Sequence, residues 1–559
     1  MHATLLSLTV AAGLLGLFFA VGALATRRLW TGRPYLSIAY GSSAVGLVSM
    51  IQFVATWLKP AAGGPTAIVL IIGALGYLIW ARAWKYWRVA LPLALLMAGI
   101  IAFYVGILSI WTVPAADFYL VLDHYFDIDS SPDNLIPFVF SQHIAAGQST
   151  HMMISDWNGS DRPPLQAGFI LLATLFAPLV GTGTDSAFGA SVVIQVLWLP
   201  GLYAVLRALG VRRKAILLGI LLAAAAGTTY FNTVYTWPKV FSAGLVFCAI
   251  ALLIDAIRRP RHFVPDFIFA VVAFVFAVLA HGVAAFVVPL VVILGIVAYR
   301  RQPVRRAIST TAIAAAAGVI LYAPWSIYQT FVDPPGDRLV KWHIAGVIPV
   351  TDHRSLLTSL VDSYSHLTLG QWLAGRWVNL ETVFKLNPFL HVGDLFARRT
   401  AEMQTTSIAL GIAFPLAALV TVWLVVKMLR KQKLTHSDRV FFFLVAAALV
   451  CIAFWCLVMF TPGDTIIQQG SQVWIFLLLV APQVWIAQRF PRLSLVALAI
   501  QFAELLVVYI PTADHGHPPI NPLGLVLGVV GLVIVVAGAT TVRRRQARLV
   551  RRPVIETPS

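Results

Sequence analysis

Long apolar stretches that recur between residues 5 and 542 constrain this chain more than any other feature. Each has about 16 to 25 residues, enough for an α-helix to cross a hydrocarbon core of roughly 30 Å. Only 11% of the residues are charged and 59% are hydrophobic, whereas soluble domains carry roughly 25% charged residues. The sequence therefore predicts an all-α, polytopic transmembrane bundle of about 15 or 16 spans.

The basic residues predict the orientation of this bundle. A net charge of +18 would suit a nucleic-acid-binding protein, but Lys and Arg form short clusters between the apolar stretches, as the positive-inside rule requires of cytoplasmic loops. This places the N-terminus outside, the C-terminal tail inside and two long loop regions on the extracytoplasmic face of the plasma (inner) membrane. The eight clusters lie at residues 27–33, 82–88, 207–214, 258–261, 300–306, 427–433, 489–492 and 543–552.

One apolar stretch disturbs this alternation. Residues 164–180 resemble a span, yet the next basic cluster, 207–214, follows after only one further span. Either the stretch re-enters the membrane, or that cluster faces outward. The sequence alone leaves both readings open.

The chain divides into four regions on this topology. Residues 1–88 form a three-span N-terminal extension, and 89–328 form a transmembrane module that includes the outer loop 113–163. Residues 329–405 form a second outer region with short interfacial helices, and 406–559 form the last spans and a basic tail. The three cysteines have no metal-ligand spacing, so neither a zinc site nor a disulfide framework is expected.

The first outer loop concentrates acidic residues, which are scarce elsewhere. Five of the 22 acids of the chain fall within 17 residues, at Asp117, Asp123, Asp127, Asp129 and Asp133. The segment 129–134 has the composition of a turn followed by a helix start. These acids are either functional carboxylates at the membrane surface or ordinary caps of a solvated loop.

A basic residue follows the acids at the entrance of the next apolar stretch. Arg162 directly precedes Pro163 and Pro164, and two prolines hold the approach to the helix rigid. Its planar guanidinium is suited to pair with a phosphate. The alternative is an interfacial arginine that extends its charged group to the membrane surface.

Together these motifs resemble the GT-C superfamily of membrane glycosyltransferases, particularly its aminoarabinose and protein mannosyl transferase branch. The resemblance rests on Asp133-Asn134, on an amphipathic helix over 135–147 that ends in Gly, and on Arg162-Pro163-Pro164-Leu165, with Asp133 lying 29 residues before Arg162. It covers residues 89–325. Two departures are the Asn134 in place of a second acid and the Arg162 in place of Lys or His.

The resemblance implies a GT-C fold and a glycosyltransferase that uses a polyprenyl-phosphate sugar. Asp133 would be the catalytic carboxylate, Arg162 would bind the lipid phosphate, and Asn134 and Asp161 would line the site. Further candidate contacts of the substrate are polar residues at predicted outer ends of spans or in the second outer region: Lys239, His281, Arg338, Lys341 and His343. Lys239 is otherwise an interfacial lysine, and His281 a histidine hydrogen-bonded between helices.

These residues support a complete reaction scheme. A base takes the proton of an acceptor hydroxyl on a glycan, lipid or protein, and cations stabilise the departing phosphate. No cofactor motif is complete, although Asp127, Asp129 and Asp133 are an alternative set of ligands for a divalent cation. The competing functions are a transporter or flippase of lipid-linked glycans and a glycan polymerase or ligase. No nucleic-acid partner is expected.

Overall fold

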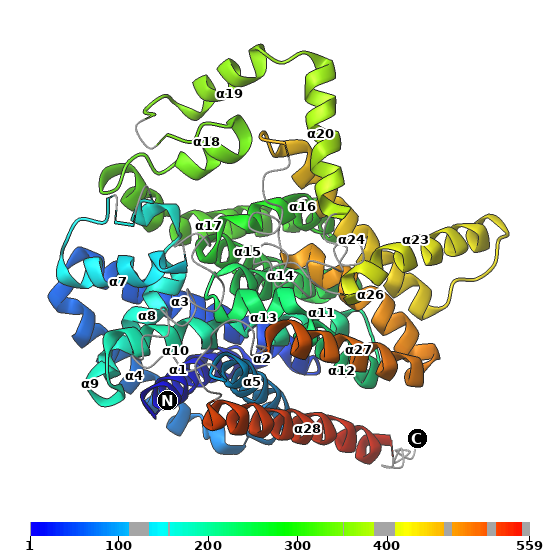
Figure 1. Ribbon diagram of the computed structural model, residues 1–559, viewed down its shortest axis with the longest axis horizontal. Helices are drawn as coiled ribbons and strands as arrows, with labels where there is room; N and C mark the ends of the chain where they lie inside the picture. The colour runs from blue at the N-terminus through cyan, green and yellow to red at the C-terminus, as the bar shows by residue number, and fades with distance from the viewer. Residues whose placement is uncertain are drawn as a thin grey trace.

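The computed structural model describes residues 2–85, 87–110, 134–151, 153–154, 157–349, 352–384, 408–462, 472–510 and 521–550 (Figure 1). These residues form helices and no strand; a single isolated bridge joins Ile154 and Trp157. For the described part of the chain, the prediction of an all-α polytopic bundle is confirmed.

Thirteen helical segments in the described ranges are long and apolar enough to cross a membrane. Five of them combine neighbouring elements: α10 with α11, and the 3-10 turns η1 (Pro34–Leu36), η2 (Pro60–Ala62), η7 (Pro260–His262) and η8 with the α-helices that follow them. They are α1 (His2–Ala25), α3 (Ser37–Leu58), α4 (Gly63–Trp80), α5 (Trp87–Leu108), α10 (Gly183–Gln195) with α11 (Trp198–Ala208), α14 (Lys239–Arg258), α15 (Phe263–Ala280), η8 (Gly282–Val287) with α16 (Val288–Tyr299), α17 (Val304–Phe331), α23 (Ile408–Leu429), α24 (His436–Val458), α27 (Pro491–Tyr509) and α28 (Pro522–Val550).

The predicted count of 15 or 16 spans is higher than this count. A fourteenth span results when α12 (Arg213–Ala225) and α13 (Gly227–Val234), which meet at an angle of 65°, are taken as one broken helix. Two shorter apolar segments explain the remaining difference. They are the segment 165–180, made of α8 (Leu165–Ala173), η6 (Thr174–Phe176) and α9 (Ala177–Val180), and α26 (Gln472–Arg489).

The lengths of the helices indicate how residues 164–180, the apolar stretch that disturbs the alternation of basic clusters, cross or re-enter the membrane. The segment 165–180 is interrupted by η6, and its last helix has only 4 residues. If α12–α13 and α26 each cross once, all eight basic clusters share one face only when this segment returns to its starting side. The short, interrupted helix favours that re-entrant path.

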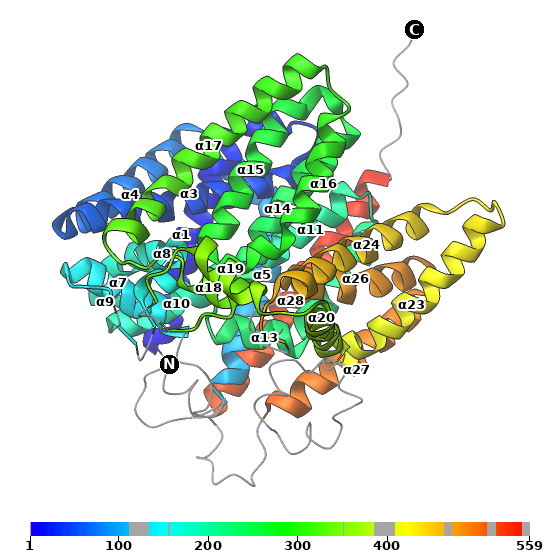
Figure 2. The ribbon, with the colours of Figure 1, turned by 90° about the horizontal axis from the view of Figure 1, so that it is seen from above.

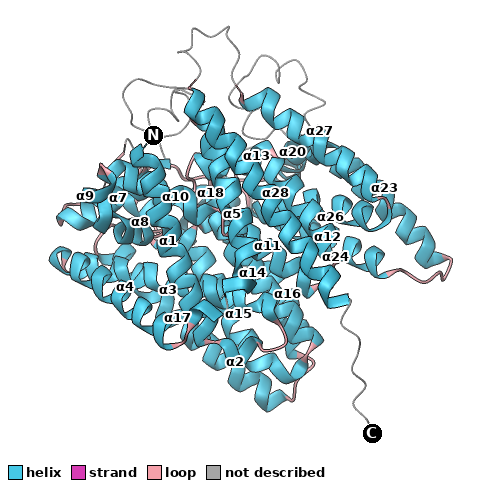
Figure 3. Ribbon diagram, turned by 90° about the horizontal axis from the view of Figure 1, so that it is seen from below, coloured by secondary structure: helices cyan, strands magenta, loops and turns pink. Residues whose placement is uncertain are grey.

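Figure 3 shows the two faces of the bundle. The N-terminus lies beside α7 (Ile136–Ala146) and α9 on one side, and α2 (Arg27–Trp30) lies on the opposite side. The predicted helix over 135–147 is confirmed as α7, which ends where Gly147 adopts a φ of 67°. The second outer region contains short helices as predicted: α18 (Arg338–Ala345), α19 (Leu356–Ser365) and α20 (Leu369–Phe384).

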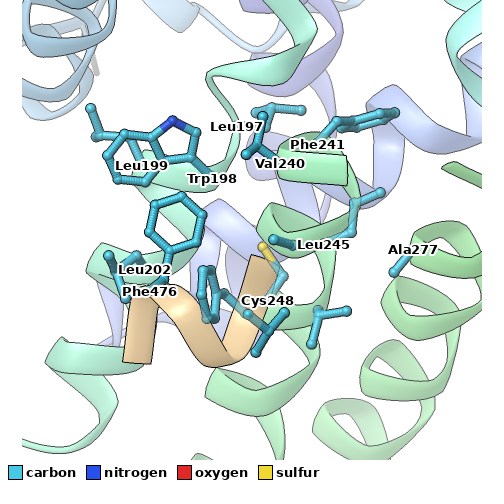
Figure 4. Packing of buried hydrophobic residues seen from close by; sticks show 14 of the residues in the cluster. Leu197, Trp198, Leu199, Leu202, Val240, Phe241, Leu245, Cys248, Ala277 and Phe476 are labelled. Atoms are coloured by element: carbon cyan, nitrogen blue, oxygen red, sulfur yellow. The ribbon is translucent and has the colours of Figure 1, made fainter. Parts of the chain in front are cut away.

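The centre of the bundle is α14, which is buried from Lys239 to Ala256. It packs against α11, α15, α3 and α26, and Figure 1 shows it between α28 on one edge and α18–α20 on the other. Figure 4 shows aromatic packing beside it, where the rings of Trp198 and Phe476 stack with centroids 4.8 Å apart. Figure 2 shows α17 running alongside α15.

A buried ion-pair network ties the first loop to this centre. Arg33 is fully buried and pairs with Asp255 near the end of α14, at 2.5 Å, and with Asp266 in α15. Tyr35 and Tyr40 donate to these two carboxylates. The N-terminal spans therefore pack on the module, with α1 on α10 and α3 on α8, α14 and α15. The boundary predicted at residue 88 stays a prediction.

Candidate functional site

Five basic side chains form the candidate site, here called the cationic cluster: Arg162, Lys239, His281, Arg338 and His343. They come from segments that are distant in sequence. Arg162 follows η5 (Gly159–Asp161), Lys239 begins α14, His281 directly follows α15, and α18 carries the other two. All of them except His343 are at most 7% exposed.

Arg162 is oriented by the short turn that precedes it. Asn158 and Asp161 form a capping box around η5, in which the Asn158 backbone N–H donates to Asp161 Oδ2 at 2.9 Å. The Arg162 Cζ lies 5.0 Å from the ring centroid of Trp157, a cation–π distance. The sequence folds this way because Pro163 and Pro164 stop the turn and start α8.

Arg338 holds the same turn from the other side. Its Nη1 donates to Asp161 Oδ2 at 2.5 Å, and its Cζ lies 5.3 Å from the centroid of Trp157. Burial raises the pKa of Asp161, although the positive charge of Arg338 acts against this rise. Trp157 thus contacts the guanidinium groups of both Arg162 and Arg338.

Lys239 is delivered by a turn with an uncommon backbone. Thr236 has a φ of 61°, which is rare for a β-branched residue. Its carbonyl accepts hydrogen bonds from Gln166 Nε2 at 3.0 Å and from Gln195 Nε2 at 3.3 Å. Gln166 lies in the first turn of α8, four residues after Arg162, so it links the two segments. The Lys239 Nζ lies 3.9 Å from the ring centroid of Trp237.

Two histidines show the electrostatic effect of the cluster's cations. Burial and, to a smaller extent, the charges of Arg162 and Lys239 lower the pKa of His343 to about 4. Burial and the charges of Arg162, Lys239 and His343 also lower the pKa of His281. Both imidazoles are therefore neutral at pH 7, in a positive potential. His281 Nδ1 accepts from the Val283 N–H at 3.1 Å, and its Nε2 has no partner among the described residues.

The structure thus brings together six predicted residues: the five of the cluster and Asp161. Lys341 lies on α18 but is bound elsewhere, because its Nζ donates to the carbonyls of Asp352 at 2.8 Å and Arg354 at 3.1 Å. Asn134 is buried, and its side-chain amide has no hydrogen-bond partner in the described ranges. The predicted base Asp133 and the four acids that precede it lie outside the described residues.

The sequence reading overlooked Asp333 as a structural residue of this site. The fully buried Asp333 carboxylate accepts from the Ser160 N–H at 2.9 Å and lies 3.0 Å from His151 Nδ1. The Ser160 hydroxyl donates to the Asp333 carbonyl, and Gln329 Nε2 donates to the Ser160 carbonyl. The end of α17 and the segment after it therefore hold Ser160 by three hydrogen bonds, two residues before Arg162. The only sequence signal was an acid directly before two prolines, which a surface loop also has.

A metal site is not formed by the described side chains, since no group of three His, Cys, Asp or Glu residues among them could hold an ion. Asp127, Asp129 and Asp133 lie outside the described ranges, so the divalent-cation alternative stays a prediction. The arrangement that is described suits an anion: buried cations, neutral imidazoles and aromatic rings.

Comparison with known proteins gives no match to a family model, to a curated protein or to a solved structure. The class of the protein therefore follows from the fold alone. Thirteen long apolar helical segments in the described part of the chain indicate a multi-pass membrane protein.

Proposed function

We propose that this protein is a membrane glycosyltransferase of GT-C type, which transfers a sugar from a polyprenyl-phosphate donor to a hydroxyl acceptor on the extracytoplasmic face. The observation that carries this proposal is the cationic cluster. Arg162 and Lys239 create a positive potential that acts on His281 and His343 at one end of the bundle. A phosphate is the natural ligand of such a site, because arginine pairs with it through two parallel hydrogen bonds.

In the proposed reaction, a carboxylate acts on the acceptor hydroxyl and cations act on the leaving phosphate. The Asp133 carboxylate takes the proton of the acceptor hydroxyl while that oxygen forms a bond to the anomeric carbon. The bond between this carbon and the phosphate oxygen breaks, and its electron pair leaves with the polyprenyl phosphate. Arg162 and Lys239 stabilise the resulting dianion, and their burial strengthens the attraction.

The first prediction tests the phosphate contact. Arg162→Ala should raise the donor KM by roughly tenfold or more, because a hydrogen-bonded charged partner is lost. Arg162→Lys should be less impaired, since it keeps the charge but not the planar fork. The measurement is donor saturation with the purified protein. Arg354→Ala is the matched control, because Arg354 is an exposed arginine in the second outer region. An unchanged donor KM in Arg162→Ala would remove Arg162 from the phosphate site.

The second prediction concerns the base. Asp133→Asn keeps the shape of the side chain and deletes its charge, so turnover should fall by roughly 10²-fold or more. Asp117→Asn and Asp123→Asn are controls with the same chemical change. Activity that persists in Asp133→Asn but is lost in Asp127→Asn or Asp129→Asn would assign the base to another acid of the loop.

One observation favours the transporter alternative. Gln501 and Glu504 of α27 are buried within a span, and Gln501 Nε2 donates to the Ala225 carbonyl at the break between α12 and α13. Polar residues at a broken span are common in transporters. The two functions differ in what accumulates when the protein is removed. A transferase leaves unused polyprenyl-phosphate sugar, and a transporter leaves its lipid-linked glycan on the cytoplasmic leaflet.

A further inference from the structure

Two turns lie side by side at the end of the bundle opposite to the cationic cluster. One joins α14 to α15 and the other joins α16 to α17. Side chains of the second turn donate to backbone carbonyls of the first: Arg301 to Ile257 at 2.9 Å, Gln302 to Pro260 at 3.0 Å, and Arg306 to Arg261 at 3.2 Å. Segments more than 40 residues apart thus form one surface.

This surface gathers arginine side chains, here called the arginine patch. Its six members are exposed: Arg258, Arg261, Arg300, Arg301, Arg305 and Arg306. Neither turn contains an acidic residue between positions 257 and 262 or between 299 and 306. Like charges held this close repel one another and favour an anionic ligand.

The nearest carboxylates in the flanking helices are turned away from this surface. Asp255 and Asp266 are at most 1% exposed and pair with the buried Arg33. Arg259, which is half-buried, lies with its Nε 3.9 Å from Asp255 Oδ1. The carboxylates closest to the turns are therefore neutralised by Arg33 inside the protein. The arginine patch has no exposed acidic partner in the two turns.

Apolar side chains continue directly from the patch. Val304 and Ile308 of α17 are 67% and 56% exposed, and Ile296 of α16 is 46% exposed. These residues belong to membrane-spanning segments whose ends carry the arginines. A ligand that covers both surfaces has an anionic head and an apolar tail, which a soluble nucleotide or acidic protein lacks.

We propose that the arginine patch binds the phosphodiester headgroups of acidic phospholipids in the cytoplasmic leaflet. The guanidinium groups pair with the phosphate oxygens, and the acyl chains lie along α16 and α17. This site lies at the other end of the bundle from the cationic cluster, and the proposal does not rest on the proposed function.

The test is native mass spectrometry of the full chain in detergent, titrated with phosphatidylglycerol or with phosphatidylcholine of the same acyl chains. The wild type should bind phosphatidylglycerol more tightly. Arg261→Gln combined with Arg305→Gln should weaken that binding by about tenfold and leave phosphatidylcholine binding unchanged. Arg261→Lys with Arg305→Lys should keep most of the affinity, because both charges remain.

The matched control is Lys431→Gln with Lys433→Gln, which removes two exposed charges from the turn between α23 and α24. It should change the affinity by less than about twofold. Melting temperatures in detergent establish that each variant is folded. Equal binding of both lipids by the wild type would overturn the proposal, as would an equal loss in the control. Displacement of phosphatidylglycerol by tripolyphosphate at matched ionic strength would also overturn it, since the site would then take a soluble polyanion.

Discussion

At the scale of single residues, the candidate site depends on hydrogen bonds that orient a cation and on burial that keeps a histidine neutral. Asp333 and Arg338 hold Ser160 and Asp161, and these contacts orient Arg162. His343 is neutral at pH 7 because burial and the neighbouring cations disfavour its protonated form. Each of these effects is local, and each has a measurable consequence for stability.

His343 should make the protein less stable in mild acid. Its pKa is about 4 in the folded protein and about 6.5 in an unfolded chain, so the unfolded state binds more protons between these values. The free energy of unfolding therefore falls as the pH drops from about 6.5 to about 4, by up to roughly 3 kcal/mol from this group. His343→Gln should lose less melting temperature than the wild type between pH 7.5 and pH 5.

The control for this pH effect is His366→Gln, because the His366 side chain is 79% exposed. Its melting temperature should follow that of the wild type at both pH values. A His343→Gln protein that loses as much stability in acid as the wild type would show that another group causes the acid sensitivity.

At the scale of helices, α5 and α28 pack with their backbones in close contact. A Cβ atom at Gly531 would lie 2.4 Å from the Phe103 backbone nitrogen and 2.7 Å from the Gly99 carbonyl oxygen. Small residues let membrane helices approach in this way. A backbone atom cannot yield as a flexible side chain does, so this helix pair requires a glycine at position 531.

Gly531→Ala should therefore push the two helices apart and destabilise the protein by about 1–3 kcal/mol, as overpacking does. Gly528→Ala is the matched control on the same helix, because a Cβ there meets nothing within 4 Å. It should be neutral or slightly stabilising, since alanine favours a helix more than glycine does. The measurement is the melting temperature of each variant in detergent, and a similar loss in both would contradict the packing.

At the scale of the whole molecule, the path of residues 165–180 decides the topology. If this segment re-enters, Thr182 lies outside and Lys214 inside. If it spans, the two positions exchange sides. Both side chains are exposed, and the three cysteines of the chain are buried.

A single cysteine at position 182 should therefore react with a membrane-impermeant thiol reagent added to intact cells, and a cysteine at position 214 should not. The wild type, whose own cysteines are buried, serves as the background control. Protection at 182 combined with labelling at 214 would place the cluster 207–214 outside and exclude the re-entrant path.

The sequence by itself determined the class of fold and the residue types of the site. Long apolar stretches leave the backbone no alternative to helices in lipid, so the all-α bundle, α7 and the short helices α18–α20 were predictable. Arg162, Lys239, His281, Arg338 and His343 were recognisable because ionisable residues at the ends of spans are uncommon.

Only the tertiary structure decided which of these residues meet. Periodicity carries no information on contacts between segments more than 100 residues apart, so neither the pairing of Arg338 with Asp161 nor the diversion of Lys341 to the Asp352 and Arg354 carbonyls could be read from the chain. Helix length also depends on local breaks, which is why fewer than 15 helical segments in the described part of the chain are long enough to span on their own. The role of Asp333 also depended on packing. A carboxylate beside two prolines is typical of a surface turn, and only the folded structure shows that this one is buried.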